Sequence, residues 1–178
     1  MNVDLHALAA ELGTADRTLR RSIEQGLLRI ERPSPRKVSL PVKEREFLRR
    51  SWPLLSGLRL ALRTEPSVSL AVLFGSAARG DAHEGSDVDV LVAFRPRADR
   101  RALAGRLSER FAKDVQLVAL EDAREKPLLL AEVLGEGRVL VDRDRLWSGL
   151  QGERPKVERA AARERARVER EFVELFVA

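Results

Sequence analysis

The sequence predicts an α/β (α+β) fold: a small mixed sheet with flanking helices, preceded by a short helical segment with a hairpin and followed by a long C-terminal helix. Three observations predict this order. The continuous apolar run 68–74, bounded by Pro66 and Gly75, is typical of a buried strand. Two further strand patterns, 86–94 and 114–120, enclose a helical pattern. Apolar residues then recur at helical spacing near the end of the chain.

The composition is globular, and it excludes several kinds of site. The 178 residues are 44% hydrophobic and 34% charged. Because there is no cysteine, disulfides, thiolate nucleophiles and cysteine-ligated metals are excluded, and two histidines, His6 and His83, are too few for a multi-histidine metal site. No apolar stretch reaches the roughly 18 residues of a membrane span. The first residues also lack the basic start of a secretory signal, so we expect a soluble cytoplasmic protein.

The net charge of +5 is concentrated in the N-terminal part of the chain. Residues 1–50 carry 11 basic and 7 acidic side chains, a balance of +4. Residues 51–150 carry 15 of each, and residues 151–178 carry 7 basic and 6 acidic side chains. Because a local cluster of cations is typical of nucleic-acid-binding surfaces, the N-terminal segment is the candidate DNA-binding part.

The first 26 residues predict two short helices. In the first, apolar residues fall at helical spacing up to a terminating glycine: Leu5, Leu8, Ala9, Leu12 and Gly13. The second is expected from about Ala15 to Gln25, with Thr14 as its N-cap and with Leu19 and Ile23 facing inward. Three arginines lie off that apolar stripe, on the exposed side: Arg17, Arg20 and Arg21.

A hairpin is predicted next, because alternating residues 28–31 and 37–40 flank a proline-containing turn. Its cations are Arg32, Arg36 and Lys37. Residues 4–41 as a whole resemble the winged helix-turn-helix domains of bacterial regulators. That resemblance implies DNA binding through the exposed arginines of the second helix and the cations of the hairpin, which would neutralise phosphates. The alternative is a small helical cap whose arginines are merely solvated.

Residues 42–63 predict an amphipathic helix that Pro53 interrupts. Six apolar residues recur at steps of three and four: Phe47, Leu48, Trp52, Leu55, Leu58 and Leu62. Since proline breaks or kinks a helix, we expect either two helices or one bent helix. Residues 64–67 are the predicted domain boundary.

A phosphate-binding turn is predicted directly after the buried strand. Gly75 and Ser76 lead into a short helix, where free backbone N–H groups and a small hydroxyl suit a phosphate. The next strand begins with Asp87 and Asp89, which share one face about 6.6 Å apart along the chain. Two carboxylates so placed can hold a hard divalent cation such as Mg²⁺. The alternative is the solvated face of an edge strand.

The order and spacing of these motifs are those of a known family. The segment LFGSAARGDAHEGSDVDVLV places ten residues between the Gly-Ser pair and the Asp-x-Asp pair. It resembles the minimal (MNT) branch of the polymerase-β-like nucleotidyltransferase superfamily, over about residues 55–145. The resemblance implies binding of a nucleoside triphosphate by Gly75 and Ser76, and of Mg²⁺ or Mn²⁺ by Asp87 and Asp89. Arg79 is close enough to help with the phosphate charge, and the alternative is a solvated helix arginine. The implied reaction is transfer of a nucleotidyl group from ATP or another NTP to a hydroxyl.

The third strand departs from the family pattern. Active relatives usually carry a third acid there, as a base or a metal ligand, whereas this chain has Gln116 in that place. Glutamine is neutral and cannot take a proton at neutral pH. Asp114 lies on the same face but is displaced by roughly 6.6 Å along the strand. The catalytic candidates are Asp87, Asp89 and Asp114, and we interpret His83 as a surface residue of the connecting loop.

The C-terminal part predicts a short helix at 128–134, a turn at 135–137, a short strand at 138–141 and a long amphipathic helix from Pro155 onward. The narrow apolar stripe of that last helix is expected to pack back onto the domain or against a second copy of the chain. The predicted units are therefore a winged helix-turn-helix (1–42), a connecting helix (43–66), a nucleotidyltransferase domain (67–145) and a C-terminal helix (146–178).

The resemblance implies Mg-dependent transfer of NMP, in the first place AMP from ATP, to a protein or another hydroxyl acceptor. Members of this branch are often antitoxins that modify a HEPN-type toxin, and an N-terminal DNA-binding part would suit autoregulation. One alternative is a DNA-binding regulator whose impaired nucleotidyltransferase domain serves as a nucleotide sensor or dimerisation platform, which Gln116 favours. Another is adenylylation of small molecules, for which a DNA-binding part has no obvious use.

Overall fold

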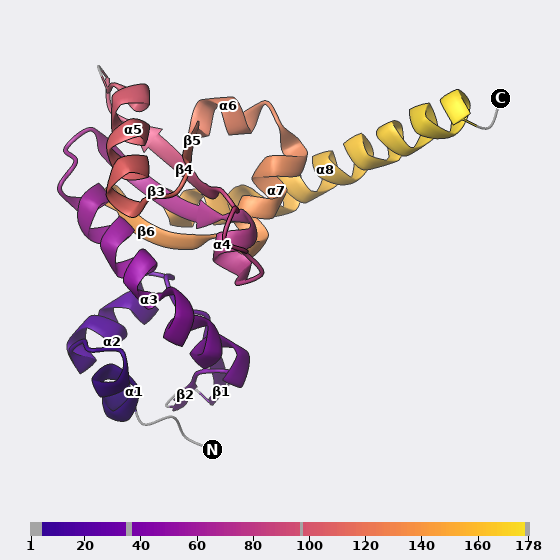
Figure 1. The fold of residues 1–178 in the computed structure, drawn as a ribbon. Coiled ribbons are helices and arrows are strands. Elements are labelled where there is room, and N and C mark those ends of the chain that lie inside the picture. The colour runs from indigo at the N-terminus through magenta and orange to yellow at the C-terminus, as the bar shows by residue number, and fades with distance from the viewer. Residues whose placement is uncertain (1–4, 35–36, 97, 177–178) are drawn as a thin grey trace.

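The computed structural model describes residues 5–34, 37–96 and 98–176. At its centre is a four-stranded mixed sheet with helices on both faces, and a helix pair with a two-stranded hairpin lies at the N-terminal end (Figure 1). In chain order the elements are α1 (Leu5–Glu11), α2 (Asp16–Glu24), β1 (Glu31–Ser34), β2 (Lys37–Ser39), α3 (Val42–Arg63), β3 (Val68–Phe74), α4 (Gly75–Arg79), β4 (Val88–Phe94), α5 (Arg100–Phe111), β5 (Val115–Ala119), α6 (Leu120–Arg124), α7 (Pro127–Glu136), β6 (Arg138–Asp142) and α8 (Leu146–Phe176).

The predicted α/β class and mixed sheet are confirmed. The strand order is β5-β4-β3-β6, in which β3 runs antiparallel to both β4 and β6, and β4 runs parallel to β5. In this register Asp89 pairs with Phe74 on one side and with Gln116 on the other. The sheet therefore brings the turn after β3, the acidic start of β4 and the start of β5 to one edge.

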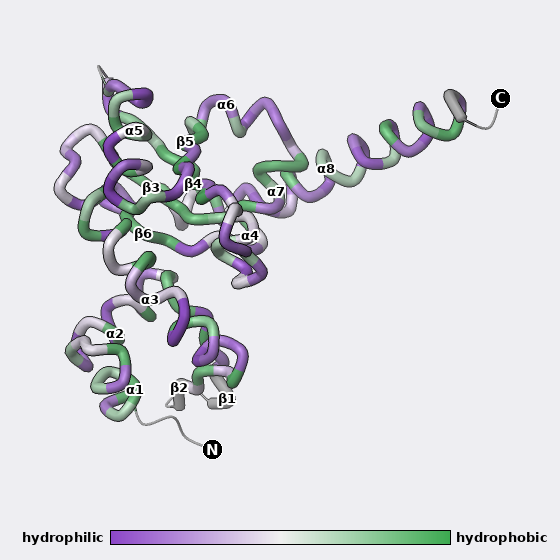
Figure 2. The backbone as a smooth tube through the Cα atoms, viewed as in Figure 1, coloured by the Kyte–Doolittle hydropathy of each residue, from purple (hydrophilic) through white to green (hydrophobic). Residues whose placement is uncertain are grey.

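Both faces of the sheet are covered, which explains why all seven residues of β3 are buried and apolar or small. One face packs under α3 and α5, where Leu103 and Leu107 belong to the same buried cluster as Val90 and Val92. The other face packs under α6, α7 and α8, where Leu130 and Val133 join the second cluster. Figure 2 shows the resulting hydrophobic colour along β3 and α7.

The N-terminal elements share the larger of these two cores. Leu19 of α2 and Leu27 of the following turn are fully buried in the same cluster as α3 and one face of the sheet. The backbone N–H of Val139 donates to the carbonyl of Gly26 at 3.2 Å, so that turn also contacts β6. The helix pair is thus packed against the rest of the protein by apolar burial.

The structure corrects the prediction at several helix ends. Thr14 does not cap α2, because Ala15 takes the N-cap position. The Thr14 N–H donates instead to the Ala9 carbonyl of the preceding turn, at 2.9 Å. The helix α3 continues through Pro53 as one element, so the alternative of two helices is wrong. The C-terminal helix α8 begins at Leu146 and contains Pro155 inside it, instead of starting there.

Two further features concern the C-terminal half. The short helix α6 follows β5 directly, so the third strand ends at Ala119 rather than Leu120. The first part of α8 packs beside α7, and its second part extends away from the body of the protein (Figure 1). None of the helices in the described residues is long and apolar enough to span a membrane.

Candidate functional site

The turn after β3 is shaped by the absence of a side chain at Gly75. Its backbone has a φ of +68°, a left-handed conformation that glycine adopts without steric cost. A Cβ built at this position would lie 2.9 Å from Oδ2 of Asp89. Glycine therefore lets the Asp89 carboxylate lie directly against the turn, where Ser76 is half-buried at the start of α4.

Four of the predicted site residues line one groove. Its lining consists of the start of α4, the loop that follows it and the start of β4: Ser76, Arg79, Asp81, His83, Gly85, Ser86, Asp87 and Asp89. Within the loop, the His83 N–H donates to Ser86 Oγ at 2.9 Å and the Ser86 N–H donates to the His83 carbonyl at 3.0 Å. His83 is an exposed loop residue, as expected, but it also lines the groove, which its sequence context did not indicate.

The two aspartates differ in environment. Asp87 is exposed, whereas Asp89 is half-buried. Burial raises the pKa of Asp89 above its ordinary value, and the negative charges of Asp87, Glu132 and Asp114 raise it further. A cation bound beside this partly buried carboxylate would offset its repulsion by the other carboxylates.

The donor set suits a hard cation, although the protein supplies few ligands. Carboxylate oxygens are the ligands that Mg²⁺ prefers, and Mg²⁺ commonly takes its remaining ligands from water and substrate phosphates. Among the described residues, no group of three or more His, Cys, Asp or Glu side chains is arranged to hold a metal ion. Asp87 and Asp89 would therefore hold such an ion together with oxygens from outside the protein.

The third strand places an amide, not a carboxylate, beside the acid pair. Gln116 Nε2 donates a hydrogen bond of 2.8 Å to Asp87 Oδ2. Asp114 is exposed and lies one step before β5, where its carbonyl accepts the Val88 N–H at 2.8 Å. It does not line the groove, although its charge acts on Asp89. Of the three catalytic candidates, the structure thus brings Asp87 and Asp89 together and leaves Asp114 at the margin.

Arg79 is held by acidic side chains from the loop that follows it and from α7. Its guanidinium lies 3.2 Å from Asp81 Oδ2, 2.7 Å from Glu132 Oε1 and 3.3 Å from Glu136 Oε2. Hydrogen bonds to these three carboxylates raise the pKa of Arg79 above its ordinary value. Sequence reasoning missed Glu132 and Glu136, because the pattern of α7 indicates only its apolar face.

The candidate DNA-binding residues lie far from this groove in the chain. Arg17, Arg20 and Arg21 are exposed on α2, and Arg20 Nε pairs with Asp16 Oδ2 at 2.9 Å. Arg32 and Lys37 belong to strands β1 and β2, which pair antiparallel, and Arg36 lies outside the described residues. None of these six residues lines the groove, as far as the described part of the chain shows.

The part of the chain that carries the groove is similar to known proteins. Residues 58–146 match the family described as Polymerase beta, Nucleotidyltransferase. No curated protein matches the chain. A chain from a crystal structure of a toxin-antitoxin with AMP-PNP is 25% identical, with a TM-score of 0.55, and the match covers 67% of this chain and 98% of that one.

Two further solved structures share the fold. A chain of a mutant toxin-antitoxin MntA-HpeT is 24% identical, with a TM-score of 0.56, over 67% of this chain and 98% of its own. A chain from the complex of a tri-AMPylated Shewanella oneidensis HEPN toxin with its MNT antitoxin is 22% identical, with a TM-score of 0.53, over 69% of this chain and 98% of its own.

Proposed function

Because this chain belongs to the polymerase-β nucleotidyltransferase family, we propose that it transfers a nucleoside monophosphate, in the first place AMP from ATP, to a hydroxyl of an acceptor. The observation that carries the proposal is that Ser76, Asp87 and Asp89 line the same groove. Residues 67–145 would form the transferase domain, with the connecting helix 43–66 before it and the helical segment 146–178 after it.

The chain's own residues bind and orient the nucleotide in this proposal. The turn of Gly75 and the hydroxyl of Ser76 hold the triphosphate at the start of α4. The acceptor oxygen attacks the α-phosphorus in line, the bond from that phosphorus to the bridging oxygen breaks, and pyrophosphate leaves. Gln116 cannot take the hydroxyl proton, so the candidate acceptor is Asp114, which lies at the margin of the groove. When bound by Asp87 and Asp89, a divalent cation supplies charge neutralisation on the phosphate oxygens.

The proposed acceptor is a HEPN-type toxin, so that the protein acts as the antitoxin of a pair. Support comes from the similar structures, which include a toxin-antitoxin with AMP-PNP and a tri-AMPylated HEPN toxin in complex with an MNT antitoxin. The groove is open and exposed along Asp87 and His83, so a hydroxyl on a protein segment can reach it.

The assay uses ATP labelled on its α-phosphate, Mg²⁺ and the product of the neighbouring gene. We expect label on the neighbouring protein, and loss of at least about a hundredfold in rate for Asp87→Asn and Asp89→Asn, because both remove groove carboxylates. Asp122→Asn is the matched control, since Asp122 is exposed on α6 and pairs with Arg100 outside the groove. Label transfer that is absent, or that is unchanged in both groove variants, would contradict the proposal.

We further propose that residues 1–42 form a winged helix-turn-helix that binds the promoter of the protein's own operon. Arg17, Arg20, Arg21, Arg32, Arg36 and Lys37 would neutralise phosphates. The measurement is affinity for promoter DNA against salt concentration. Removing one phosphate contact, as in Arg20→Ala, should reduce the slope of log K against log salt by about 0.9, whereas the exposed α5 residue Arg101, replaced by Ala, should leave it unchanged.

One observation favours a second candidate function, a DNA-binding regulator with an impaired transferase domain that senses nucleotides. The Gln116 amide donates to Asp87, so a neutral group occupies the place where relatives have an acid. In that case nucleotide would bind without label transfer, and its binding would change the affinity for the promoter. Measuring promoter affinity with and without ATP separates the two functions.

A further inference from the structure

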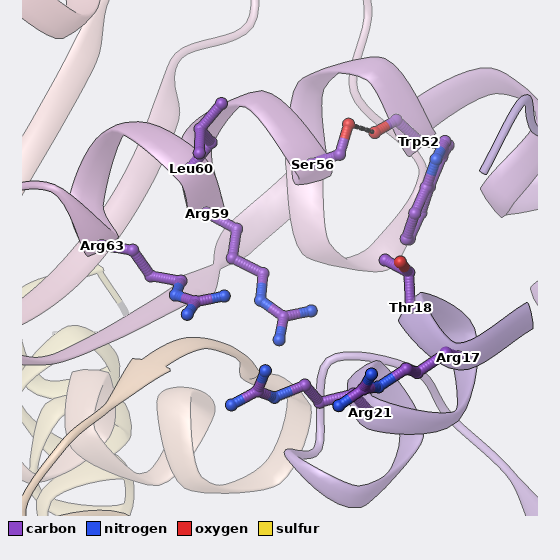
Figure 3. Close-up of a pocket in the computed structure, with 8 residues that line it drawn as sticks. All are labelled: Arg17, Thr18, Arg21, Trp52, Ser56, Arg59, Leu60 and Arg63. Atoms are coloured by element: carbon purple, nitrogen blue, oxygen red, sulfur yellow. Dashed lines mark hydrogen bonds between the residues drawn. The ribbon is translucent and has the colours of Figure 1, made fainter. Parts of the chain in front are cut away.

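Four arginines converge on a pocket between α2 and α3, on surfaces that the transferase chemistry does not use. The lining residues are Arg17, Thr18, Arg21, Trp52, Ser56, Arg59, Leu60 and Arg63. Figure 3 shows the guanidinium groups of Arg21, Arg59 and Arg63 extending toward the same space, with Thr18 and Trp52 at its other end. None of these residues lines the groove of Ser76 and Asp89.

Arg59 forms the floor of this pocket and is nearly buried, with 7% of its surface exposed. Its Nη1 donates to Ser22 Oγ at 2.6 Å, and its Nη2 donates to Gln25 Oε1. Its Nε is buried and has no hydrogen-bond partner among the described residues. Both partners are neutral, so the positive charge of a buried guanidinium is left without a compensating carboxylate.

The other three cations of the pocket are also without acidic partners. In the described part of the chain, no Asp or Glu oxygen lies within ion-pair distance of Arg17, Arg21, Arg59 or Arg63. The pKa of Arg59 is lowered by burial first and then by the charges of Arg63 and Arg21. This contrasts with Arg79 and Arg138, which both face carboxylates.

From this cluster we infer a second anion site: the pocket between α2 and α3 binds the diphosphate or triphosphate group of a small molecule, of the nucleotide class. Guanidinium groups form the strongest hydrogen bonds to phosphate oxygens because both partners are charged. The cavity measures about 340 Å³, which falls in the range that holds small ligands. The hydroxyls of Thr18 and Ser56 add neutral donors beside the cations.

Around the buried Arg59 the concave shape favours a small anion over a DNA backbone as the source of the phosphate, whereas the exposed Arg17 and Arg21 border both this pocket and the proposed DNA surface. Contacts to DNA phosphates are made by exposed cations along a surface. Arg59, in contrast, is buried against α2 and lines the pocket. A ligand there would contact α2 and α3 together and offset the repulsion among their arginines.

The test is titration of the full chain with sodium pyrophosphate in EDTA at constant ionic strength, followed by calorimetry and by the thermal midpoint. Expected is one site per chain and a raised midpoint. Arg63→Ala and Arg17→Ala, both exposed positions, should each weaken binding about tenfold. Arg101→Ala on α5 should leave pyrophosphate affinity unchanged. EDTA removes the divalent cation that the proposed transferase groove would need, and this separates the two sites.

Three outcomes would overturn the inference. An equal rise of the thermal midpoint in NaCl of the same ionic strength would show that the salt alone stabilises the chain and that pyrophosphate has no specific site. Binding that is equal in Arg17→Ala, Arg63→Ala and the native chain would place the anion elsewhere. A thermal midpoint that rises with duplex DNA, but with neither pyrophosphate nor ATP, would assign these arginines to the DNA surface instead. Circular dichroism of each variant establishes that it is folded before its affinity is compared.

Discussion

Arg138 of β6 and Glu44 of α3 form a bidentate ion pair inside the protein. The two hydrogen bonds measure 2.6 and 2.9 Å, and the side chains are 2% and 4% exposed. The same guanidinium donates to the carbonyls of Ala78 and Leu27 and lies 3.9 Å from the centre of the Phe47 ring. This one pair thus joins the turn after α2, the connecting helix, α4 and the sheet.

Breaking that pair from one side should be costly. Glu44→Gln leaves the Arg138 charge buried without a counter-charge, so we expect the free energy of unfolding to fall by about 3–5 kcal/mol. Equilibrium unfolding in urea measures it. Glu153→Gln is the control, because Glu153 pairs with Arg124 on the surface, where loss of an ion pair costs less than about 1 kcal/mol. Equal losses in the two variants would contradict the prediction.

Restoring a carboxylate on the third strand should strengthen metal binding. Gln116→Asp removes the hydrogen bond to Asp87 and adds a third acid beside Asp89, so we expect Mn²⁺ affinity to rise about tenfold or more. Titration calorimetry with Mn²⁺ measures this. Gln116→Leu removes the same hydrogen bond without adding charge, and a similar gain in that variant would show that release of Asp87, and not the new acid, is responsible.

A side chain at Gly75 should disrupt the site. Gly75→Ala forces a positive φ on alanine and places a Cβ against Asp89. We therefore expect the free energy of unfolding to fall by about 1–3 kcal/mol and most of the label transfer to be lost. Gly105→Ala is matched to it, because Gly105 is exposed in α5 with open space around it, and that change should stabilise the helix by up to about 1 kcal/mol. A Gly75→Ala variant with native stability and activity would contradict the close approach of Asp89 to the Gly75 backbone.

The raised pKa of Asp89 predicts how metal-free stability depends on pH. Between the ordinary and the raised pKa the folded state binds more protons than the unfolded state, so stability falls as the pH rises through that window. Ionised Asp89 therefore costs stability at neutral pH. In EDTA, Asp89→Asn should raise the thermal midpoint at pH 7 and reduce the pH dependence, whereas Asp122→Asn should do neither. A lower thermal midpoint for Asp89→Asn would contradict the prediction that ionised Asp89 destabilises the folded state.

Residues close in sequence made much of the site predictable. The run 68–74 and the Gly75-Ser76 turn indicated a buried strand and its end, and the structure has both at those positions. The side chains that modify the site come from distant segments: Glu132 acts on Asp89 and on Arg79 from α7. Local patterns carry no information about such pairs, because strand order and helix packing bring them together.

Tertiary packing also explains why the start of α8 and the surroundings of the α2 arginines differ from the prediction. Helical periodicity beyond Pro155 was recognised, but α8 starts earlier because its first turns pack on α7, a tertiary contact that outweighs weak local propensity. The arginines of α2 were expected on an outward surface. Arg17 and Arg21 are exposed, yet they also border a pocket with α3, which no spacing within α2 could indicate.

The continuous core has a consequence for how the chain unfolds and how it can be divided. Leu19, Leu27 and Leu40 lie in one cluster with α3 and with one face of the sheet. A fragment that begins at residue 43 would expose apolar surface on α3 that these leucines cover, and would also lose the Leu27 carbonyl that accepts from Arg138. We therefore expect a single cooperative melting transition for the whole chain, and poor solubility for the isolated transferase segment.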